Sequence, residues 1–332
     1  MAGPSTEEWK ALYQAADAYM KAAPWQWIAD SDTFAVRDPA TGVPSYCSVM
    51  GGGGYTFGLA AFIGPEGLAG LLRLFDENNE DPLVLLSVRT VSATLGDRKE
   101  LLKEDLQVIR TLGLRFRGPG AWPVFRSQHP EYMPWLIDRD EALLLTTVLE
   151  QTVETASDVH GGGLDLARGS HANLVMTRYL HEGQWRGEWV KPGLPPPSRP
   201  VEADPKLVAA VKKSEKGVGG AWEVGFFLVT APIAKGNERP YYPTALLAMD
   251  PKRDFIVATE IMGAPAGPKK ASAFLKALVK APLLPSEVRV PDQDTMWVLE
   301  PAASAVGIRL KVAAVPKLKK TAEGMLRAIM RA

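Results

Sequence analysis

The chain has 332 residues, 46% of them apolar and 23% charged, which excludes a disordered protein and allows two domains of ordinary size. No stretch approaches about 18 uncharged apolar residues, and the acidic start MAGPSTEEWKALYQ lacks the regions of a signal peptide, so we expect neither a membrane span nor a secretory leader. One cysteine, Cys47, excludes an internal disulfide framework, and four histidines offer little for a zinc site. We therefore expect a cytoplasmic protein without a membrane partner.

The first 190 residues alternate between helical and strand patterns. Apolar spacing predicts helices over 6–22, 65–75, 98–111 and 138–156, and strands over 33–37, 45–50, 55–63, 83–90 and 172–180. Ser5 or Thr6 is the expected cap of the first helix. The run Gly51–Gly54 joins two strands and is typical of a hairpin loop that needs positive φ angles.

A proline-rich segment divides the chain. Residues 191–206, KPGLPPPSRPVEADPK, contain six prolines, and this composition predicts a semi-rigid linker between an N-terminal domain over 1–190 and a C-terminal domain over 207–332. Beyond it the patterns predict helices over 205–216, 268–281, 293–306 and 320–331, and strands over 222–231, 242–249, 254–262, 286–290 and 308–314.

Both halves share one order of elements: three strands, then helix, strand, helix, strand and helix. The strings FGLAAFIGPEGLAGLLRL and FIVATEIMGAPAGPKKASAFLKAL also share a layout of strand, glycine, proline and helix. This favours an internal duplication. The predicted fold class is α/β (α+β), with two domains that each contain a mixed sheet flanked by helices.

The formal net charge of zero hides an asymmetry between the halves. Residues 1–200 carry 18 Lys and Arg against 25 Asp and Glu, a balance of −7, and residues 201–332 carry 20 against 13, a balance of +7. Two interpretations remain open: the halves attract each other, or the basic half binds a polyanion. Lys317, Lys319 and Lys320 cluster at the start of the last helix, where the helix dipole disfavours cations. They are either ligands for an anion or part of a solvated face.

Three arginines alternate with aromatic residues in the segment LRFRGPGAWPVFRS. Guanidinium groups pair with phosphate and aromatic rings stack on bases, so Arg115, Arg117 and Arg126 are candidate ligands of single-stranded nucleic acid. The simpler alternative is that they pack on neighbouring tryptophans at the edge of the core.

Several strings are similar to a family of uncharacterised bacterial and archaeal proteins known only as domains of unknown function. They are PWQWIADSDTFAVRDPATG, FGLAAFIGPEGL, the run from LGLRFRGPGAWPVFRS to PWLIDRDEA, and RPYYPTALLAMDPKRDFIVATEI. Together they span most of the chain. The resemblance implies no activity.

The C-terminal order of elements more remotely resembles the ribonuclease H-like fold of nucleases, integrases and transposases. That resemblance implies a divalent-metal site of Mg²⁺ or Mn²⁺ at Asp250, Asp292 and Glu323, because two hard cations held by carboxylates clamp the phosphate oxygens. The sequence departs from the pattern. If 222–231 is the first strand, Asp250 falls in the turn between the second and third strands, and only a sheet that begins at Thr244 brings it near Asp292.

No complete catalytic motif is present. HGGG at 160–163 resembles a lipase oxyanion loop, but no G-x-S-x-G string accompanies it. We therefore expect a non-catalytic binding or interaction protein, without a cofactor, whose partner is a protein or a polyanion. The alternatives are a metal-dependent nuclease or phosphoryl-transfer enzyme in the C-terminal domain, and a nucleic-acid-binding module.

Overall fold

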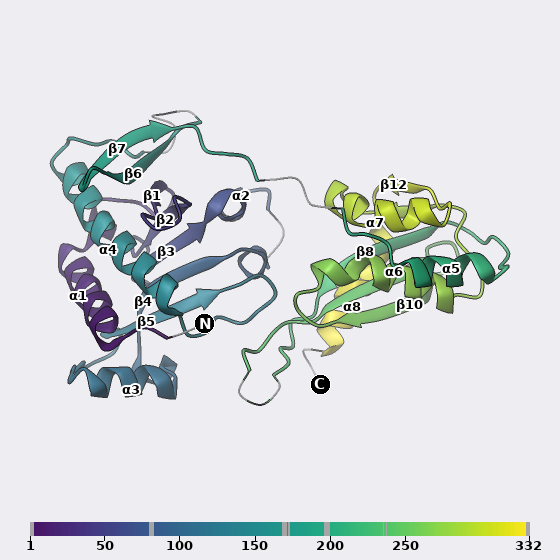
Figure 1. Ribbon diagram of the computed structural model, residues 1–332, viewed down its shortest axis with the longest axis horizontal. Helices are drawn as coiled ribbons and strands as arrows, with labels where there is room; N and C mark the ends of the chain where they lie inside the picture. Colours follow the sequence, from purple (N-terminus) through teal and green to yellow (C-terminus); the bar gives the residue numbers. More distant parts are fainter. Residues whose placement is uncertain are drawn as a thin grey trace. The chain divides into compact units, whose positions relative to one another are not determined.

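The computed structural model describes residues 3–79, 83–167, 171, 173–195, 200–234, 236 and 238–329. The chain divides into two units: unit 1 comprises Met1–Pro130 and Pro134–Pro196, and unit 2 comprises Glu131–Met133 and Pro197–Ala332. Each unit is a mixed sheet with helices on both faces (Figure 1).

Unit 1 is built from long antiparallel strands and four helices among its described residues. The helices are α1 (Thr6–Ala22), α2 (Gly64–Leu74), α3 (Lys103–Thr111) and α4 (Arg139–His160). The strands are β1 (Phe34–Arg37), β2 (Pro44–Met50), β3 (Gly58–Ile63), β4 (Thr90–Gly96), β5 (Trp122–Gln128), β6 (Val175–His181) and β7 (Gln184–Val190). Short 3-10 helices cover Pro24–Gln26, Val84–Ser87 and Arg98–Glu100.

One seven-stranded sheet organises unit 1, in the order β5-β4-β3-β2-β1-β6-β7. Neighbouring strands are antiparallel except β1 and β6, which run parallel. Helices α1 and α4 lie side by side over one face, and α2 covers the other (Figure 1). Because successive side chains of a strand point to opposite faces, Phe34 and Val36 belong to the core under α1 and α4, whereas Ala35 belongs to the core under α2.

Unit 2 has a smaller sheet with helices on both sides. Its helices are α5 (Pro205–Lys213), α6 (Lys270–Lys280), α7 (Gln293–Ala305) and α8 (Pro316–Ile329), with a 3-10 helix over Gly267–Lys269. Its strands are β8 (Trp222–Leu228), β9 (Thr244–Asp250), β10 (Phe255–Met262), β11 (Val288–Val290) and β12 (Leu310–Val312).

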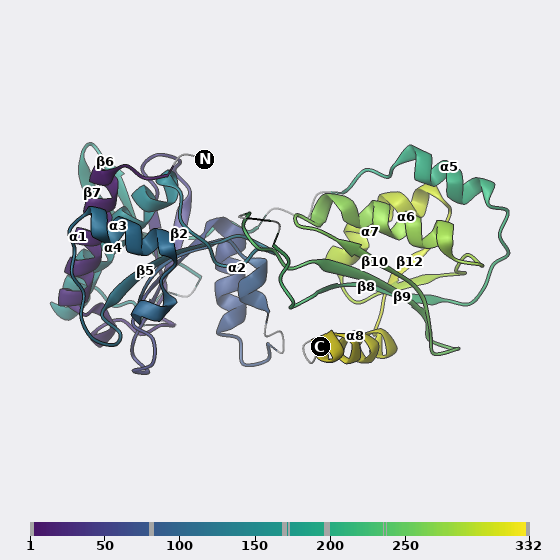
Figure 2. The same cartoon turned by 90° about the horizontal axis from the view of Figure 1, so that it is seen from below.

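The sheet of unit 2 has the order β10-β9-β8-β11-β12. Strands β8, β9 and β10 form an antiparallel meander, and β11 runs parallel to both β8 and β12. Figure 2 shows α8 on the face opposite to α5, α6 and α7. Every residue of β9 is buried, as expected for a strand covered on both faces.

Three residues that follow β5 in the sequence belong to unit 2. Glu131 has a left-handed backbone with a φ of 69°. Its carboxylate accepts hydrogen bonds from the Ala266 N–H at 2.7 Å and the Thr244 hydroxyl at 3.3 Å, and its carbonyl accepts one from the Tyr242 N–H at 2.7 Å. The Met133 N–H donates to the Pro240 carbonyl at 2.9 Å. Unit 2 is therefore discontinuous in sequence.

The predicted fold class is confirmed, since each unit is a mixed sheet flanked by helices. The strand predicted over 83–90 is wrong, because Val84–Ser87 form a 3-10 helix and the strand begins at Thr90. Strands β5 and β7 are missing from the sequence prediction. Pro123 lies inside β5, and β7 is polar with a central glycine, and both features normally argue against a strand.

The predicted helix over 98–111 is interrupted: residues Arg98–Glu100 form a 3-10 helix, and only Lys103–Thr111 are α-helical. The described residues 191–195 and 200–204 of the predicted linker form no helix or strand, and α5 begins at Pro205. Residues 196–199 of the linker lie outside the described part of the chain, as do 172 in a predicted strand and 330–331 in the last predicted helix. None of the helices in the described ranges combines the length and apolar character needed to cross a bilayer.

The two units do not repeat each other strand for strand. Both contain a three-stranded antiparallel meander with a parallel strand beside its first member: β6 beside β1, and β11 beside β8. In unit 1, however, β4 and β5 continue the sheet beyond β3 in antiparallel fashion, whereas in unit 2 the later strands lie on the opposite side, parallel to β8. The shared layout is therefore confined to the meander and its parallel neighbour.

Candidate functional site

Asp250 lies at the tight turn between β9 and β10. It is the last residue of β9, is paired with Phe255, and is buried. Its Oδ1 accepts hydrogen bonds from the backbone N–H groups of Lys252 at 2.9 Å and Arg253 at 3.2 Å. An aspartate that bonds the N–H groups two and three residues later is the usual stabiliser of such a turn. The carboxylate is thus engaged locally.

The other two acids of the postulated metal site lie elsewhere. Asp292 caps α7 by accepting from the Thr295 N–H at 2.7 Å, and Glu323 pairs with Arg327 on an exposed face of α8 at 3.0 Å. The strand pairings place Asp250 level with Val288, so Asp292 is four residues further along the sheet, or about 13 Å. Among the described residues, no three His, Cys, Asp or Glu side chains are placed to hold a metal ion.

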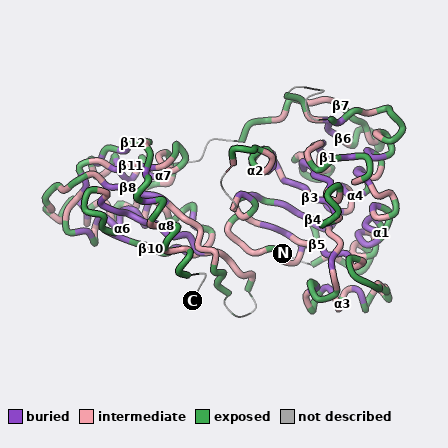
Figure 3. Tube along the Cα trace, turned by 180° about the vertical axis from the view of Figure 1, so that it is seen from behind, coloured by how far each residue is buried: buried purple, intermediate pink, exposed green. Residues whose placement is uncertain are grey.

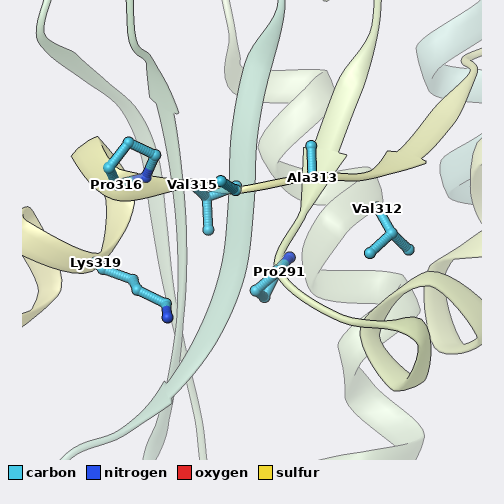
Figure 4. A pocket seen from close by; sticks show the side chains of 7 residues that line it. Pro291, Val312, Ala313, Val315, Pro316 and Lys319 are labelled. Atoms are coloured by element: carbon cyan, nitrogen blue, oxygen red, sulfur yellow. The ribbon is translucent and has the colours of Figure 1, made fainter.

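The three sequence-predicted lysines differ in their surroundings. Lys317 forms an ion pair with Asp254 at 3.0 Å. Lys320 is exposed and forms no ion pair with a described residue. Lys319 lines a cavity of about 450 Å³ at the carboxyl ends of β11 and β12 (Figure 4). The remaining walls of that cavity are apolar or backbone, from Pro291, Val312, Ala313, Ala314, Val315 and Pro316. It therefore offers a single cation.

The three sequence-predicted arginines also separate. Arg126 forms a double hydrogen bond with Asp105, with Nη1–Oδ1 at 3.1 Å and Nη2–Oδ2 at 2.7 Å, and it also donates to the Phe125 and Glu100 carbonyls. Its guanidinium is largely buried and its donors are occupied by protein acceptors. This geometry gives Arg126 a structural role, unlike Arg115 and Arg117.

Arg115 and Arg117 line a second cavity, of about 360 Å³, which we call the arginine groove. Its cationic residues are Arg98, Arg110, Arg115 and Arg117, and its apolar residues are Leu106, Ile109, Leu114, Phe116 and Trp122. All four arginines are exposed, and no acid belongs to the lining. The groove is therefore a concentrated positive surface around an apolar floor, in the half of the chain that carries net negative charge.

One connection, the segment 97–121 between the adjacent strands β4 and β5, builds almost the whole groove. Helix α3 buries Asp105 and Ile109, and Figure 3 shows that much of the rest of the helix is exposed. Gly113 ends the helix in the left-handed conformation at a φ of 67°, and the Leu114 N–H donates to the Ile109 carbonyl at 3.0 Å. Residues 114–117 then belong to no helix or strand. Along them Leu114 and Phe116 are half-buried, whereas the two arginines are exposed.

The floor of the groove is anchored to the core of unit 1. Phe116 packs on Tyr13 with ring centroids 6.0 Å apart and on Trp122 with centroids 5.6 Å apart. Burial raises the pKa of the Tyr13 hydroxyl, and the Asp105 carboxylate raises it further, so this phenol stays neutral. Trp122 begins β5 and is paired with Gly96 at the end of β4. The rings are thus fixed before any ligand arrives.

The arginines of the groove carry charges that the protein leaves uncompensated. The guanidinium groups of Arg98, Arg115 and Arg117 form no ion pair or hydrogen bond with a described residue, and that of Arg110 donates only to the Leu106 carbonyl. Asp97 belongs to the same connection, but its Oδ1 accepts from the Gly120 N–H and its Oδ2 lies 3.6 Å from Lys99 Nζ. An anionic ligand would supply the missing acceptors.

Arg98 and Arg110 are not among the sequence-predicted ligands. They are separated from Arg115 by the 3-10 turn, α3 and the chain reversal, so their convergence depends on tertiary structure. The only sequence signal is Gly113 directly after a helical pattern, which marks the reversal but not the position of the side chains. Cys47, the single thiol, is fully buried, and burial raises its pKa, so it offers no exposed nucleophile.

Comparison with known proteins identifies two domain families along the chain. Residues 9–178 match the model of a domain of unknown function (DUF7309), and residues 207–326 match that of a second domain of unknown function (DUF6930). A search of curated proteins finds no match to the chain. The arginine groove lies entirely within the first match, which covers just over half of the sequence. The chain therefore belongs to the DUF7309 family and carries a DUF6930 domain after it.

Proposed function

We propose that this protein is a non-catalytic binding protein whose ligand is an anion held in the arginine groove. The observation that carries the proposal is four exposed arginines around one apolar floor without an acid in the lining. Guanidinium forks bind phosphate and carboxylate oxygens bidentately, and the groove offers several forks at once.

The chemistry of the lining supports binding over catalysis. Its side chains are arginine, leucine, isoleucine, phenylalanine and tryptophan. Arginine stays protonated in proteins, and the other side chains carry no acid, base or nucleophile, so the groove can hold and orient an anion but has no group to transfer a proton. Its volume of about 360 Å³ lies within the range of small-ligand sites.

The cavity beside Lys319 is a weaker candidate for the same role. It has one cationic side chain, and the nearby Lys317 is paired with Asp254. A single ammonium on a flexible stem fixes an anion less firmly than several planar forks do. The basic character of residues 201–332 therefore supports a weaker, less specific attraction of polyanions at most.

We also propose that unit 2 has a ribonuclease H-like fold. Its support is that three antiparallel strands, β8 to β10, precede α6, and that β11 and β12 run parallel to β8. The only acid on β8, Glu223, is buried and accepts from the Leu318 N–H at 2.8 Å, so it caps α8. We further propose a cytoplasmic location, which is supported by the single cysteine, Cys47, a buried free thiol.

Binding of anionic polymers to the full-length chain tests this function. We would titrate inorganic polyphosphate, polyglutamate and a single-stranded oligonucleotide, and compare the wild type with the double variant Arg115→Ala/Arg117→Ala. The matched control is Lys319→Ala/Lys320→Ala, which removes the same charge from unit 2. At least one polymer should bind, and the arginine variant should lose about tenfold in affinity while the control stays within about twofold. Equal losses in both variants, or no binding by any polymer, would overturn the proposal.

A further inference from the structure

The geometry of the arginine groove points to a more specific ligand, and the argument rests on the anion-binding function proposed above. We infer that the groove binds single-stranded nucleic acid, with a base on its apolar floor and the flanking phosphates on its arginines. Three features support this: the distribution of charge, the nature of the floor, and the choice of cation.

The charges come from two parts of the connection between β4 and β5. Arg98 and Arg110 belong to the 3-10 helix and α3, whereas Arg115 and Arg117 belong to the segment that follows the chain reversal. Arg115 and Arg117 are exposed, and Phe116 between them is half-buried. A ligand that uses the guanidinium groups and the floor together must combine several anions with an apolar body. A nucleotide strand repeats this pattern at every residue.

The floor provides aromatic surface that a free phosphate would not use. Phe116 and Trp122 are half-buried, and Tyr13 supports Phe116 from the core side. Because these rings are already held in place, they lose little conformational entropy when a planar ligand stacks on them. Stacking of bases on aromatic side chains is sequence-tolerant, because every base has a π-face.

The cations in the lining are all arginines. A guanidinium can pair with a phosphate and can also lie flat on a base, whereas an ammonium does only the former. A duplex would present its phosphates but keep its bases stacked on each other, leaving the aromatic floor unused. An acidic peptide would pair its carboxylates with the arginines, but it has few planar side chains that could stack on the aromatic floor. Single-stranded nucleic acid uses the cations and the floor together.

A comparison of ligands with equal charge tests the inference. The full-length chain would be titrated with an oligothymidylate of about 12 nucleotides and with an abasic strand of the same length, which keeps every phosphate but has no bases. Fluorescence anisotropy at roughly 50 mM salt reports the affinities. We expect the abasic strand to bind about tenfold more weakly or worse. A duplex and a polyglutamate of matched charge should also bind more weakly than the oligothymidylate.

A variant of the floor gives a second, independent readout. Trp122→Leu keeps the groove apolar but removes the indole, and it should weaken binding of the oligothymidylate by about fivefold or more while leaving the abasic strand unaffected. Thermal unfolding of the variant checks that β5 remains folded. If Trp122→Leu is unfolded, the comparison of intact and abasic strands in the wild type still decides.

The outcomes separate this inference from the proposed function. Equal affinity for intact and abasic strands overturns the base-binding role while anion binding stands. Tighter binding of polyglutamate or of the duplex overturns it in favour of an acidic protein or double-stranded nucleic acid. Failure of every polymer to bind removes both the inference and the proposed function.

Discussion

Glu141 shows how one buried charge joins β5 to α4. Its Oε1 accepts from the Ser127 hydroxyl at 2.8 Å and lies 3.2 Å from His129 Nε2 and 3.6 Å from Arg89 Nη2. Its Oε2 accepts from the Asp138 N–H at 3.2 Å and completes the capping box of α4. Burial by itself raises the pKa of Glu141, but the hydrogen bonds from His129, Ser127 and Asp138 outweigh it and hold the pKa below its usual value.

The lowered pKa of Glu141 predicts a specific dependence of stability on pH. A carboxyl whose pKa is lower in the folded than in the unfolded state stabilises the fold above its unfolded pKa of about 4.3, and that contribution is lost as the pH falls through the folded pKa. The free energy of unfolding of the Glu141→Gln variant should therefore be about 2 kcal/mol lower than that of the wild type near neutral pH. Urea unfolding at several pH values should show this difference shrinking below about pH 4. A difference that stays constant or grows with acidification would contradict the prediction.

At this scale the sequence identifies the types of residue but not their partners. Arg115, Arg117 and Arg126 look alike in the segment LRFRGPGAWPVFRS, yet only the first two line the groove. Arg126 is separated from its partner Asp105 by 21 positions, and this pairing depends on how α3 packs beside β5. The turn at Asp250 is different: an aspartate before Pro251 signals a turn locally, and Asp250 indeed bonds the two following N–H groups of the turn.

Helix α2 packs closely against β3 and the segment before β4, and its glycines allow this packing. A Cβ atom on Gly67 would lie 2.6 Å from the backbone carbon of Phe62, and one on Gly70 would lie 2.2 Å from a methyl group of Val88. Leu68 and Leu71, on the same helix, are buried against Tyr46. The small residues therefore allow the approach, and the leucines fill the core that it creates.

Adding a methyl group at these glycines should have opposite effects on two helices. Gly67→Ala introduces a clash with backbone that cannot move aside, and should lower the free energy of unfolding by about 1–3 kcal/mol. Gly324→Ala, on α8, meets no atom within 4 Å and should raise it by about 0.5–1 kcal/mol through helix propensity. Urea unfolding of both variants, followed by far-ultraviolet circular dichroism, checks the pair. Equal stability of the two variants would show that α2 is not closely packed.

The segment Glu131–Met133 offers a test of the discontinuous unit 2. Glu131→Ala removes a carboxylate that accepts from Ala266 and Thr244 and leaves a side chain in the left-handed region, so unit 2 should lose about 2 kcal/mol of stability. Glu131→Gly removes the same acceptor but relieves the backbone, and should cost about 1 kcal/mol less. Denaturant unfolding of both variants measures the difference. If alanine and glycine are equivalent, the left-handed conformation of Glu131 is not maintained.

Whole elements were predictable where local signals agree. The cap of α1 is Ser5, whose hydroxyl accepts from the Glu8 N–H while the Glu8 carboxylate accepts from the Ser5 N–H, and both residues stand at the start of a clear apolar period. The pairing of β6 with β1 had no such signal, because four strands and three α-helices lie between them in the sequence. The groove was unpredictable for the same reason: it combines residues from a 3-10 helix, an α-helix and the segment that follows.

For the whole molecule, the relevant quantity is the contrast between net and local charge. The chain is formally neutral, and residues 1–200 carry −7, so long-range steering of a polyanion toward unit 1 should be weak. The groove nevertheless gathers four arginines without an acid in its lining. Within a Debye length of about 10 Å at 0.1 M salt, a ligand in the groove interacts more strongly with the arginines that line it than with acids elsewhere in unit 1. Affinity should therefore depend on local contacts, and the salt dependence of the affinity should reflect how many phosphates the arginines neutralise.

The number of arginine–phosphate contacts can be measured from this salt dependence. For a single strand, the logarithm of the association constant falls with the logarithm of the salt concentration by about 0.7 for each phosphate that is neutralised, so four arginines predict a slope of about −3 for the wild type. Arg115→Ala/Arg117→Ala removes two contacts and should make the slope about 1.4 shallower, whereas Lys319→Ala/Lys320→Ala should leave it unchanged. Anisotropy titrations of oligothymidylate between roughly 50 and 200 mM salt provide the slopes. A slope near zero in the wild type would mean that binding does not use the arginines, and a slope shared by all three proteins would place the contacts outside the groove. A slope that becomes shallower with loss of the groove arginines, and with loss of no other cations, fits a strand whose phosphates contact those arginines.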